Sequence, residues 1–356
     1  MRLNARSQIA LCVVVVSLLT NAALFGPCFC AGVKIDPALR FMSPHPEIGE
    51  AVPACKIEYA LASKEVNDVV FVGDSGGACA FDPLEFQRTC GETAYNLCSE
   101  AGLGPIGYYI TLKAYLDHHS GTKAVVLCVT PVTMERTAGS LGGDLQARFA
   151  KHYEPEIGTV GSLDRFLYFS RIGLESHWSP YDPAARDKPL KYFETETYST
   201  LRRKLEESRG FNRLIAHGGK PFQPGPTKEP PILDEWTRAV RIMAMLCEQR
   251  RVLMFVVFSP VRNDMRDART FKPLQSWCDG MRGQRSLRIV RPAILFYNDP
   301  LMWDSIHVGA DGAQRFSRYV AKCFDGVLNA AGVARFMPMV ANDVRAILQR
   351  ESVKGH

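Results

Sequence analysis

Three short apolar runs constrain the fold of this chain most strongly. They cover residues 68–73, 124–130 and 253–259, and valine, phenylalanine and leucine make up most of each run. Strands that read as near-continuous apolar runs are typical of a parallel sheet covered on both faces. Amphipathic helical patterns separate the runs, and this alternation predicts an α/β fold built on a parallel sheet.

The remaining predicted elements continue this alternation. Apolar residues recur every three to four positions in the predicted helices. These further elements are strands at 94–97 and 287–290 and helices at 105–118, 233–247, 271–282 and 310–328. The pattern loosens between residues 137 and 231, which predicts an insertion over one end of the sheet, serving as a lid or a substrate platform. A charged helical run at 198–209 is expected inside it.

The N-terminal segment carries no charge from Ile9 to Phe29, and Arg2 and Arg6 precede it. About 20 such residues are enough to span a bilayer, and positive charge before the segment keeps that end in the cytoplasm. Polar residues in its second half also fit a cleaved signal peptide. We expect a single-pass anchor in the cell membrane with the domain on the extracytoplasmic side, or a secreted or periplasmic domain if the segment is cleaved. The predicted parts are 1–31 as anchor or signal peptide, 32–67 as a leader, 68–330 as the domain including the insertion 137–231, and 331–356 as a tail.

Composition argues against several functions. The formal net charge is +6 and is spread along the chain, with no basic block that carries interleaved aromatics, so nucleic acid is not an expected partner. No two cysteines have the spacing of a zinc site, so no structural metal is expected. Cys79 and Cys90 are close in sequence and are candidates for a disulfide in an exported protein. Several other cysteines fit buried positions.

The segment Gly73-Asp74-Ser75-Gly76-Gly77 directly follows the first apolar run. In a parallel α/β sheet, ligands bind outside the carboxyl ends of the strands. A serine there points into the crevice, and the next backbone N–H groups open a helix and can stabilise an oxyanion. The two glycines then leave room for a substrate. The alternative is a turn in which Ser75 only caps the next helix.

The segment Asp304-Ser-Ile-His307 precedes the last predicted helix. A serine hydroxyl is a weak nucleophile without an adjacent base, and histidine commonly supplies one. The histidine in turn needs an acceptor that fixes its tautomer and orientation. A single turn delivers both groups. Alone, the pair also fits a surface turn in which Asp304 caps a helix.

Two motifs together resemble the first and last conserved blocks of the SGNH/GDSL hydrolase superfamily. The first is the Gly-Asp-Ser after the first strand. The second is the Asp-x-x-His, followed by a helix that begins with a small residue, an aspartate and a glycine. The resemblance covers residues 66–135 and 232–328. It implies a flavodoxin-like three-layer α/β/α fold. It also implies that Ser75 is the nucleophile, His307 the general base and then acid, and Asp304 the orienting carboxylate.

The resemblance further implies an oxyanion hole. The N–H of Ser75 is its first donor, and Gly102 lies where the family places its oxyanion glycine. After the third strand the family usually has Gly-x-Asn-Asp, whose asparagine donates, but residues 129–135 contain no asparagine. The candidates for a replacement are Thr130, Thr133 and Asn263. Loss of one donor typically costs about 10²–10³ in rate.

Two other hydrolase families share the same pentapeptide. It is the nucleophile motif of chymotrypsin-like proteases, but there histidine and aspartate precede the serine on an all-β fold, and only His45 precedes Ser75. It also fits the G-x-S-x-G elbow of α/β-hydrolases. That fold normally has several strands before the elbow, whereas a single predicted strand precedes Ser75.

The expected chemistry is acyl transfer through an acyl-serine, which needs no metal or organic cofactor. The expected substrate is an acyl ester or an acylated carbohydrate, and hydrolysis is the first interpretation. Two alternatives stay open. One is an O-acyltransferase acting on cell-envelope or extracellular polysaccharide, because membrane-anchored SGNH-like proteins include the alginate O-acetyltransferases. The other is a non-catalytic SGNH-like binding module.

Overall fold

The computed structural model of the chain describes most of the predicted domain. The described residues are 47–136, 145–153, 189–191, 196–212, 231–268, 270–281, 287–291 and 293–324. The predicted anchor or signal peptide (1–31) and the tail (331–356) lie outside these residues, so both stay predictions. None of the helices in the described part of the chain has the length and apolar character that a bilayer crossing requires.

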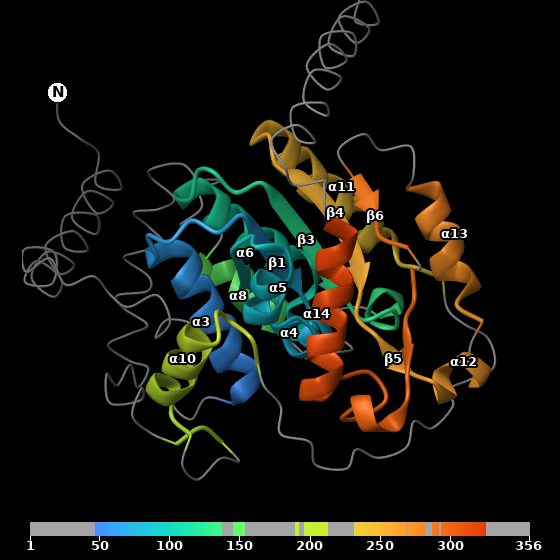
Figure 1. Cartoon of the computed structure of the whole chain (residues 1–356). Helices are drawn as coiled ribbons and strands as arrows, with labels where there is room; N and C mark the ends of the chain where they lie inside the picture. Colours follow the sequence, from blue (N-terminus) through green and yellow to red (C-terminus); the bar gives the residue numbers. More distant parts are fainter. Residues whose placement is uncertain are drawn as a thin grey trace, which may run out of the picture.

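A parallel sheet of five strands forms the centre of the fold (Figure 1). Its strands are β1 (Val69–Gly73), β2 (Ala94–Asn96), β3 (Ala124–Val129), β4 (Leu253–Phe258) and β6 (Leu287–Ile289). They lie in the order β2-β1-β3-β4-β6, and all neighbours are parallel. The winding of the chain reverses between β1 and β3. Ligands of open α/β sheets bind at such a reversal, outside the carboxyl ends of the strands.

Helices cover both faces of the sheet. Val70 of β1 faces one helix layer, and Phe71 faces the other. The first layer contains α3 (Ile48–Ala62), α6 (Gly104–His118) and α11 (Asp234–Gln249), and the second contains α4 (Ser75–Ala80), α5 (Pro83–Cys90) and α14 (Ala310–Phe324). Every residue of β3 and β4 is buried, because both faces of these strands pack against helices.

Two further helices lie on the first layer. α8 (Leu145–Tyr153) packs against α6, and α10 (Tyr198–Glu207) lies beside α3 (Figure 1). Both belong to the predicted insertion, and the helix expected at 198–209 is confirmed. The carbonyl of Arg209 accepts a hydrogen bond from the N–H of Asn96 at 2.9 Å. The described part of the insertion therefore covers α3, α6 and the edge strand β2.

The domain begins earlier than the predicted boundary at residue 68, because α3 lies in the stretch assigned to a leader. Its Lys56 is buried, and Nζ donates to the carbonyl of Asn96 at 2.5 Å. Burial lowers the pKa of Lys56 to about 8. Glu58 is also buried and accepts from the hydroxyl of Tyr198 at 2.6 Å. These buried charged residues interrupt the apolar pattern that would identify α3 as a core helix.

A two-stranded parallel sheet lies after the end of β4. It consists of β5 (Val261–Arg262) and β7 (Phe296–Tyr297), and α12 (Asp264–Ala268) and α13 (Lys272–Gly280) follow β5. The sequence predicts α13 but not the two strands, because two residues carry no periodicity. The N–H of Arg262 donates to the carbonyl of Ser305 at 3.0 Å. The small sheet therefore supports the turn that contains Asp304 and His307.

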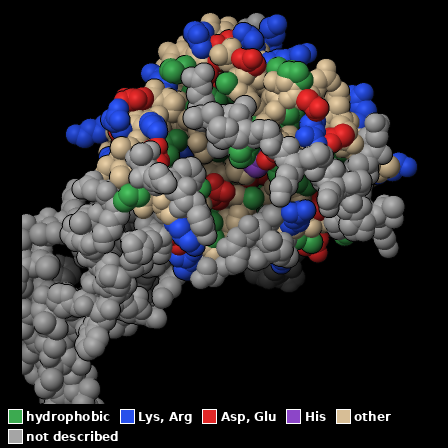
Figure 2. All heavy atoms as spheres, turned by 90° about the horizontal axis from the view of Figure 1, so that it is seen from below, with side chains coloured by type: hydrophobic (Ala, Val, Ile, Leu, Met, Phe, Trp, Pro, Cys, Tyr) green, Lys and Arg blue, Asp and Glu red, His purple; other side chains and the backbone are tan. Residues whose placement is uncertain are grey.

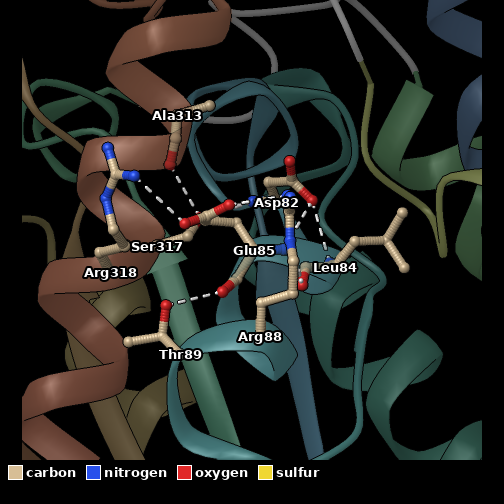
Figure 3. A network of polar contacts seen from close by, with 8 residues as sticks. All are labelled: Asp82, Leu84, Glu85, Arg88, Thr89, Ala313, Ser317 and Arg318. Atoms are coloured by element: carbon tan, nitrogen blue, oxygen red, sulfur yellow. Dashed lines mark hydrogen bonds and ion pairs between the residues drawn. The ribbon is translucent and has the colours of Figure 1, made fainter.

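A polar network joins α5 to α14 (Figure 3). The hydroxyl of Ser317 accepts from the N–H of Asp82 and donates to the carbonyl of Ala313, both at 2.8 Å. The Asp82 carboxylate also accepts two N–H groups of the first turn of α5, as an N-cap residue does. Arg318 of α14 pairs with Glu85 of α5 at 3.3 Å. The helices near the two halves of the predicted triad are thus tied to each other.

The cysteines of the described residues are all free. They include Cys79 and Cys90, so the predicted disulfide between these two is wrong. Cys79 is buried in α4, whereas Cys90 lies half-buried at the end of α5. Burial raises the pKa of the Cys79 and Cys98 thiols well above the ordinary value. These thiols therefore stay protonated and behave as small apolar groups.

Gly73 is predicted to be essential for the centre of the sheet. Its φ is 152°, and a Cβ at this position would lie 1.7 Å from the carbonyl oxygen of Cys128 on β3. We expect Gly73→Ala to lower the free energy of unfolding by about 3 kcal/mol or more, since paired backbones must move apart. Urea unfolding followed by circular dichroism measures this change.

The matched control is Gly280→Ala at the end of α13, where no atom lies within 4 Å of the Cβ position. This variant should change the free energy of unfolding by at most about 1 kcal/mol. Equal stability of the two variants would contradict the packing argument at Gly73.

Candidate active site

The turn between β1 and α4 positions the predicted nucleophile. Asp74 is the N-cap residue of α4, and its Oδ1 accepts the N–H of Gly77 at 3.2 Å. Ser75 is therefore the first residue of the helix, at the carboxyl end of β1. The N–H of a first helical residue has no acceptor within the helix. Both the hydroxyl and the N–H of Ser75 thus lie where the winding of the sheet reverses.

The Asp74 carboxylate, which is fully buried, also joins two loops. Its Oδ2 accepts the N–H of Thr130 at 2.8 Å and the hydroxyl of Thr133 at 2.6 Å. Thr133 begins a short 3-10 turn, η2 (Thr133–Glu135), after β3. This role of Asp74 is not among those predicted from the sequence. The signals for this role are a carboxylate beside Ser75 and two threonines in the block after the third strand.

Gly76 and Gly77 are required for packing beneath the turn. A Cβ on Gly76 would lie 2.1 Å from Oγ1 of Thr130 and 2.6 Å from Oγ of Ser259. One on Gly77 would lie 2.5 Å from the carbonyl oxygen of Cys128. The interpretation that these glycines leave room for a substrate is therefore corrected. They allow α4 to start directly against the ends of β3 and β4.

Asp304 and His307 share a tight turn before α14. An antiparallel bridge between Met302 and Val308 closes the turn. Oδ1 of Asp304 accepts the N–H groups of Ile306 and His307, each at 2.8 Å. Oδ2 of the same carboxylate lies 2.8 Å from Nδ1 of His307. The backbone of the turn therefore orients the carboxylate that orients the imidazole.

The structure brings the three predicted triad residues together, although Ser75 and His307 are 232 positions apart. Nε2 of His307 lies 2.9 Å from Oγ of Ser75. A carboxylate at Nδ1 assigns the ring proton of a neutral imidazole to that nitrogen, which leaves Nε2 as the acceptor. Nε2 can then accept the hydroxyl proton of Ser75. This is the geometry that general-base activation of a serine requires.

Acidic groups around His307 oppose the effect of burial on its pKa. Burial lowers the pKa of His307, but the hydrogen bond and charge of Asp304 and the charges of Asp74 and Glu100 raise it above the ordinary value. Burial raises the pKa of Asp304, but the hydrogen bond and charge of His307 and the N–H groups of the turn hold it below the ordinary value. His307 therefore contributes to the free energy of unfolding, and this contribution is lost as the pH rises through the pKa of His307 in the folded chain. The contribution of Asp304 is lost as the pH falls through the pKa of Asp304 in the folded chain.

Two of the predicted oxyanion donors follow strands of the five-stranded sheet, Gly102 after β2 and Thr130 after β3. Gly102 is buried in a 3-10 turn, η1 (Ala101–Leu103), that follows β2. Thr130 is buried beside Gly76, and its hydroxyl accepts a hydrogen bond from Ser259 at 3.4 Å. Their roles at an oxyanion stay predictions.

The other two candidates have different partners. The hydroxyl of Thr133 donates to Asp74. Asn263 is exposed, and its side-chain amide donates to Oδ1 of Asn298, which follows β7. Both side chains are thus engaged with other residues, and their roles at an oxyanion stay predictions.

The face seen from below in Figure 2 is hollowed, and a histidine and several acidic side chains lie in and around the hollow. Arg262 is a cation whose charge interacts with Asp304. It is ion-paired with Asp264 at 2.6 Å and with Asp299 at 3.6 Å. Among the described residues no group of three or more histidine, cysteine or acidic side chains is arranged to hold a metal ion.

No protein-family model matches the chain, and no curated protein matches its sequence.

We expect His307 to titrate above 6.5 in the folded chain. Asp304→Asn removes the hydrogen-bonded charge that raises this pKa, so the titration midpoint should fall. The NMR signals of the histidine ring protons measure the midpoint in both proteins. Asp279→Asn is the control, because it removes a carboxylate from the exposed surface of α13 and should leave the midpoint unchanged. The same midpoint in wild type and Asp304→Asn would contradict the electrostatic account.

Proposed function

We propose that the chain is a serine-dependent acyl-ester hydrolase of the SGNH/GDSL type. Ser75 is the nucleophile, His307 the general base and then acid, and Asp304 the carboxylate that orients the histidine. The observation that carries the proposal is the pair of hydrogen bonds that links Ser75 Oγ to Asp304 through the imidazole. Folding does not require these three side chains to meet at a strand end, whereas nucleophilic catalysis does.

The sheet supports the proposal. Counting only its own strands, the order is 2-1-3-4-5, which is the flavodoxin-like order. Helices on both faces fit the three-layer fold of the superfamily. Ser75 follows β1 and His307 precedes α14, in agreement with the first and last blocks that the sequence resembles. An all-β chymotrypsin-like fold does not fit this sheet.

The proposed reaction has two steps. In the first, Oγ of Ser75 bonds to the acyl carbon while its proton passes to Nε2 of His307, and His307 then protonates the departing alkoxide. In the second, His307 takes a proton from water, the hydroxide attacks the acyl-serine, and Ser75 recovers its proton. Asp304 stays ionised and stabilises the imidazolium in both steps. No step needs a metal or an organic cofactor.

The N–H groups of Ser75 and Gly102 are the proposed donors to the oxyanion. The first lies at the start of α4 and the second in η1, after neighbouring strands of the sheet. Export of the domain is also part of the proposal and rests on the apolar segment between Ile9 and Phe29.

Substitution of the triad tests this function. Hydrolysis of para-nitrophenyl acetate by the full chain should fall by about 10⁴-fold or more in Ser75→Ala and in His307→Ala, because either change removes the activated nucleophile. Release of para-nitrophenol gives the rate, and mass spectrometry detects acetyl-Ser75. Ser276→Ala, on the exposed surface of α13, is the control and should retain the rate.

The other outcomes distinguish the alternatives. A single burst that leaves acetyl-Ser75 until a sugar hydroxyl is added would support an O-acyltransferase. Equal rates in wild type and both variants, with no acetyl group on Ser75, would contradict the triad and favour a binding module.

A further inference from the structure

Glu100 is a carboxylate beside the proposed nucleophile that the triad chemistry does not use. It follows β2, and the N–H of the preceding Ser99 donates to the carbonyl of Gly73 at 2.8 Å. The carbonyl of Glu100 accepts from the hydroxyl of Tyr108 and from the N–H of Leu103, both at 3.0 Å. The backbone at Glu100 is therefore held next to the turn that carries Ser75.

The side chain of Glu100 has no partner of its own within the described residues. It does not cap η1, and no hydrogen bond or ion pair joins its carboxylate to a described residue. It is half-buried and packs toward the start of α3, where a Cβ on Gly49 would lie 3.9 Å from its Cγ. The backbone next to Glu100 is hydrogen-bonded to Gly73, two residues before Ser75. A charged side chain at this place can act on a ligand that is bound at Ser75.

The charge of Glu100 interacts with that of His307. Burial raises the pKa of Glu100, the charge of His307 lowers it, and the charge of Asp74 raises it. The charge of Glu100 in turn contributes to the raised pKa of His307. The nearby cation Arg262 is already paired with Asp264 and Asp299. The hollow of Figure 2 likewise displays acidic side chains beside a histidine. Among the described residues, the charges that act on His307 are therefore those of the acidic groups Asp304, Asp74 and Glu100.

We propose that Glu100 is a specificity-determining residue that restricts the site to esters that are neutral or positively charged near the reacting carbonyl. The inference rests on the proposed function, since it concerns the group that Ser75 attacks. A carboxylate on the substrate would lie close to Glu100 in a site of low effective dielectric, where like charges repel strongly. A neutral O-acyl sugar or a cationic ester meets no such repulsion.

Charged sulfonyl fluorides test this without the need for turnover. In this reaction Ser75 Oγ bonds to sulfur, fluoride leaves, and His307 takes the hydroxyl proton. Aminoethyl-benzenesulfonyl fluoride carries a cation and carboxy-benzenesulfonyl fluoride an anion, on similar rings. Mass spectrometry of the full chain at neutral pH gives the rate of Ser75 modification. We expect the cation to react about tenfold faster than the anion.

Glu100→Gln should reduce this ratio to about twofold, because the amide keeps the shape and removes the charge. Glu65→Gln is the matched control, an exposed glutamate just before the amino end of β1, and should keep the wild-type ratio. Uncharged benzenesulfonyl fluoride reports whether Ser75 remains reactive in each variant.

The outcomes separate the two proposals. Modification of Ser75 at equal rates by both charged reagents, or the same ratio in wild type and Glu100→Gln, overturns the role of Glu100 and leaves the hydrolase proposal intact. Failure of all three reagents to modify Ser75 overturns both, since a reactive Ser75 is the premise of each.

Discussion

The buried carboxylate of Asp74 holds the ends of the two central strands in register. It follows β1 directly, and it accepts hydrogen bonds from Gly77 in α4 and from Thr130 and Thr133 after β3. A buried carboxylate is stable only when such donors satisfy it. The same contacts fix the first turn of α4, and with it the hydroxyl and the N–H of Ser75. The proposed nucleophile is therefore positioned by the centre of the sheet, not by an independent loop.

The other half of the site is held by separate means. The turn of Asp304 and His307 is fixed by its own carboxylate, by the bridge before α14 and by the backbone contact from β5. The network between α5 and α14 then ties this turn to the helices that follow Ser75. Two rigid supports can keep Nε2 and Oγ at hydrogen-bond distance across a large sequence separation. Such preorganisation favours reaction, because little ordering remains to be done when a substrate binds.

Several of these features could be predicted from the sequence. β1, β3 and β4 are confirmed, because strands buried on both faces leave a continuous apolar run. The order of short motifs predicts which three residues form the proposed triad, and the structure brings their side chains together. α3 was not predicted, since Lys56 and Glu58 are buried with partners that only the tertiary fold supplies. The partner of Asn263 could not be predicted either, because its side chain donates to Asn298, which follows a strand of only two residues. The contact of Asp74 with Thr133 joins segments 59 positions apart, so the residue types are visible in the sequence but their pairing is not.

The central claim is that Oγ of Ser75 attacks the acyl carbon, with Nε2 of His307 as its base. A crystal structure of the full chain after reaction with a neutral para-nitrophenyl alkylphosphonate tests it most directly, because the adduct resembles the tetrahedral intermediate. The account predicts phosphorus bonded to Oγ of Ser75, His307 within hydrogen-bond distance, and the phosphonyl oxygen facing the N–H groups of Ser75 and Gly102. Phosphorus bonded to a different side chain, with Ser75 unmodified, would contradict it.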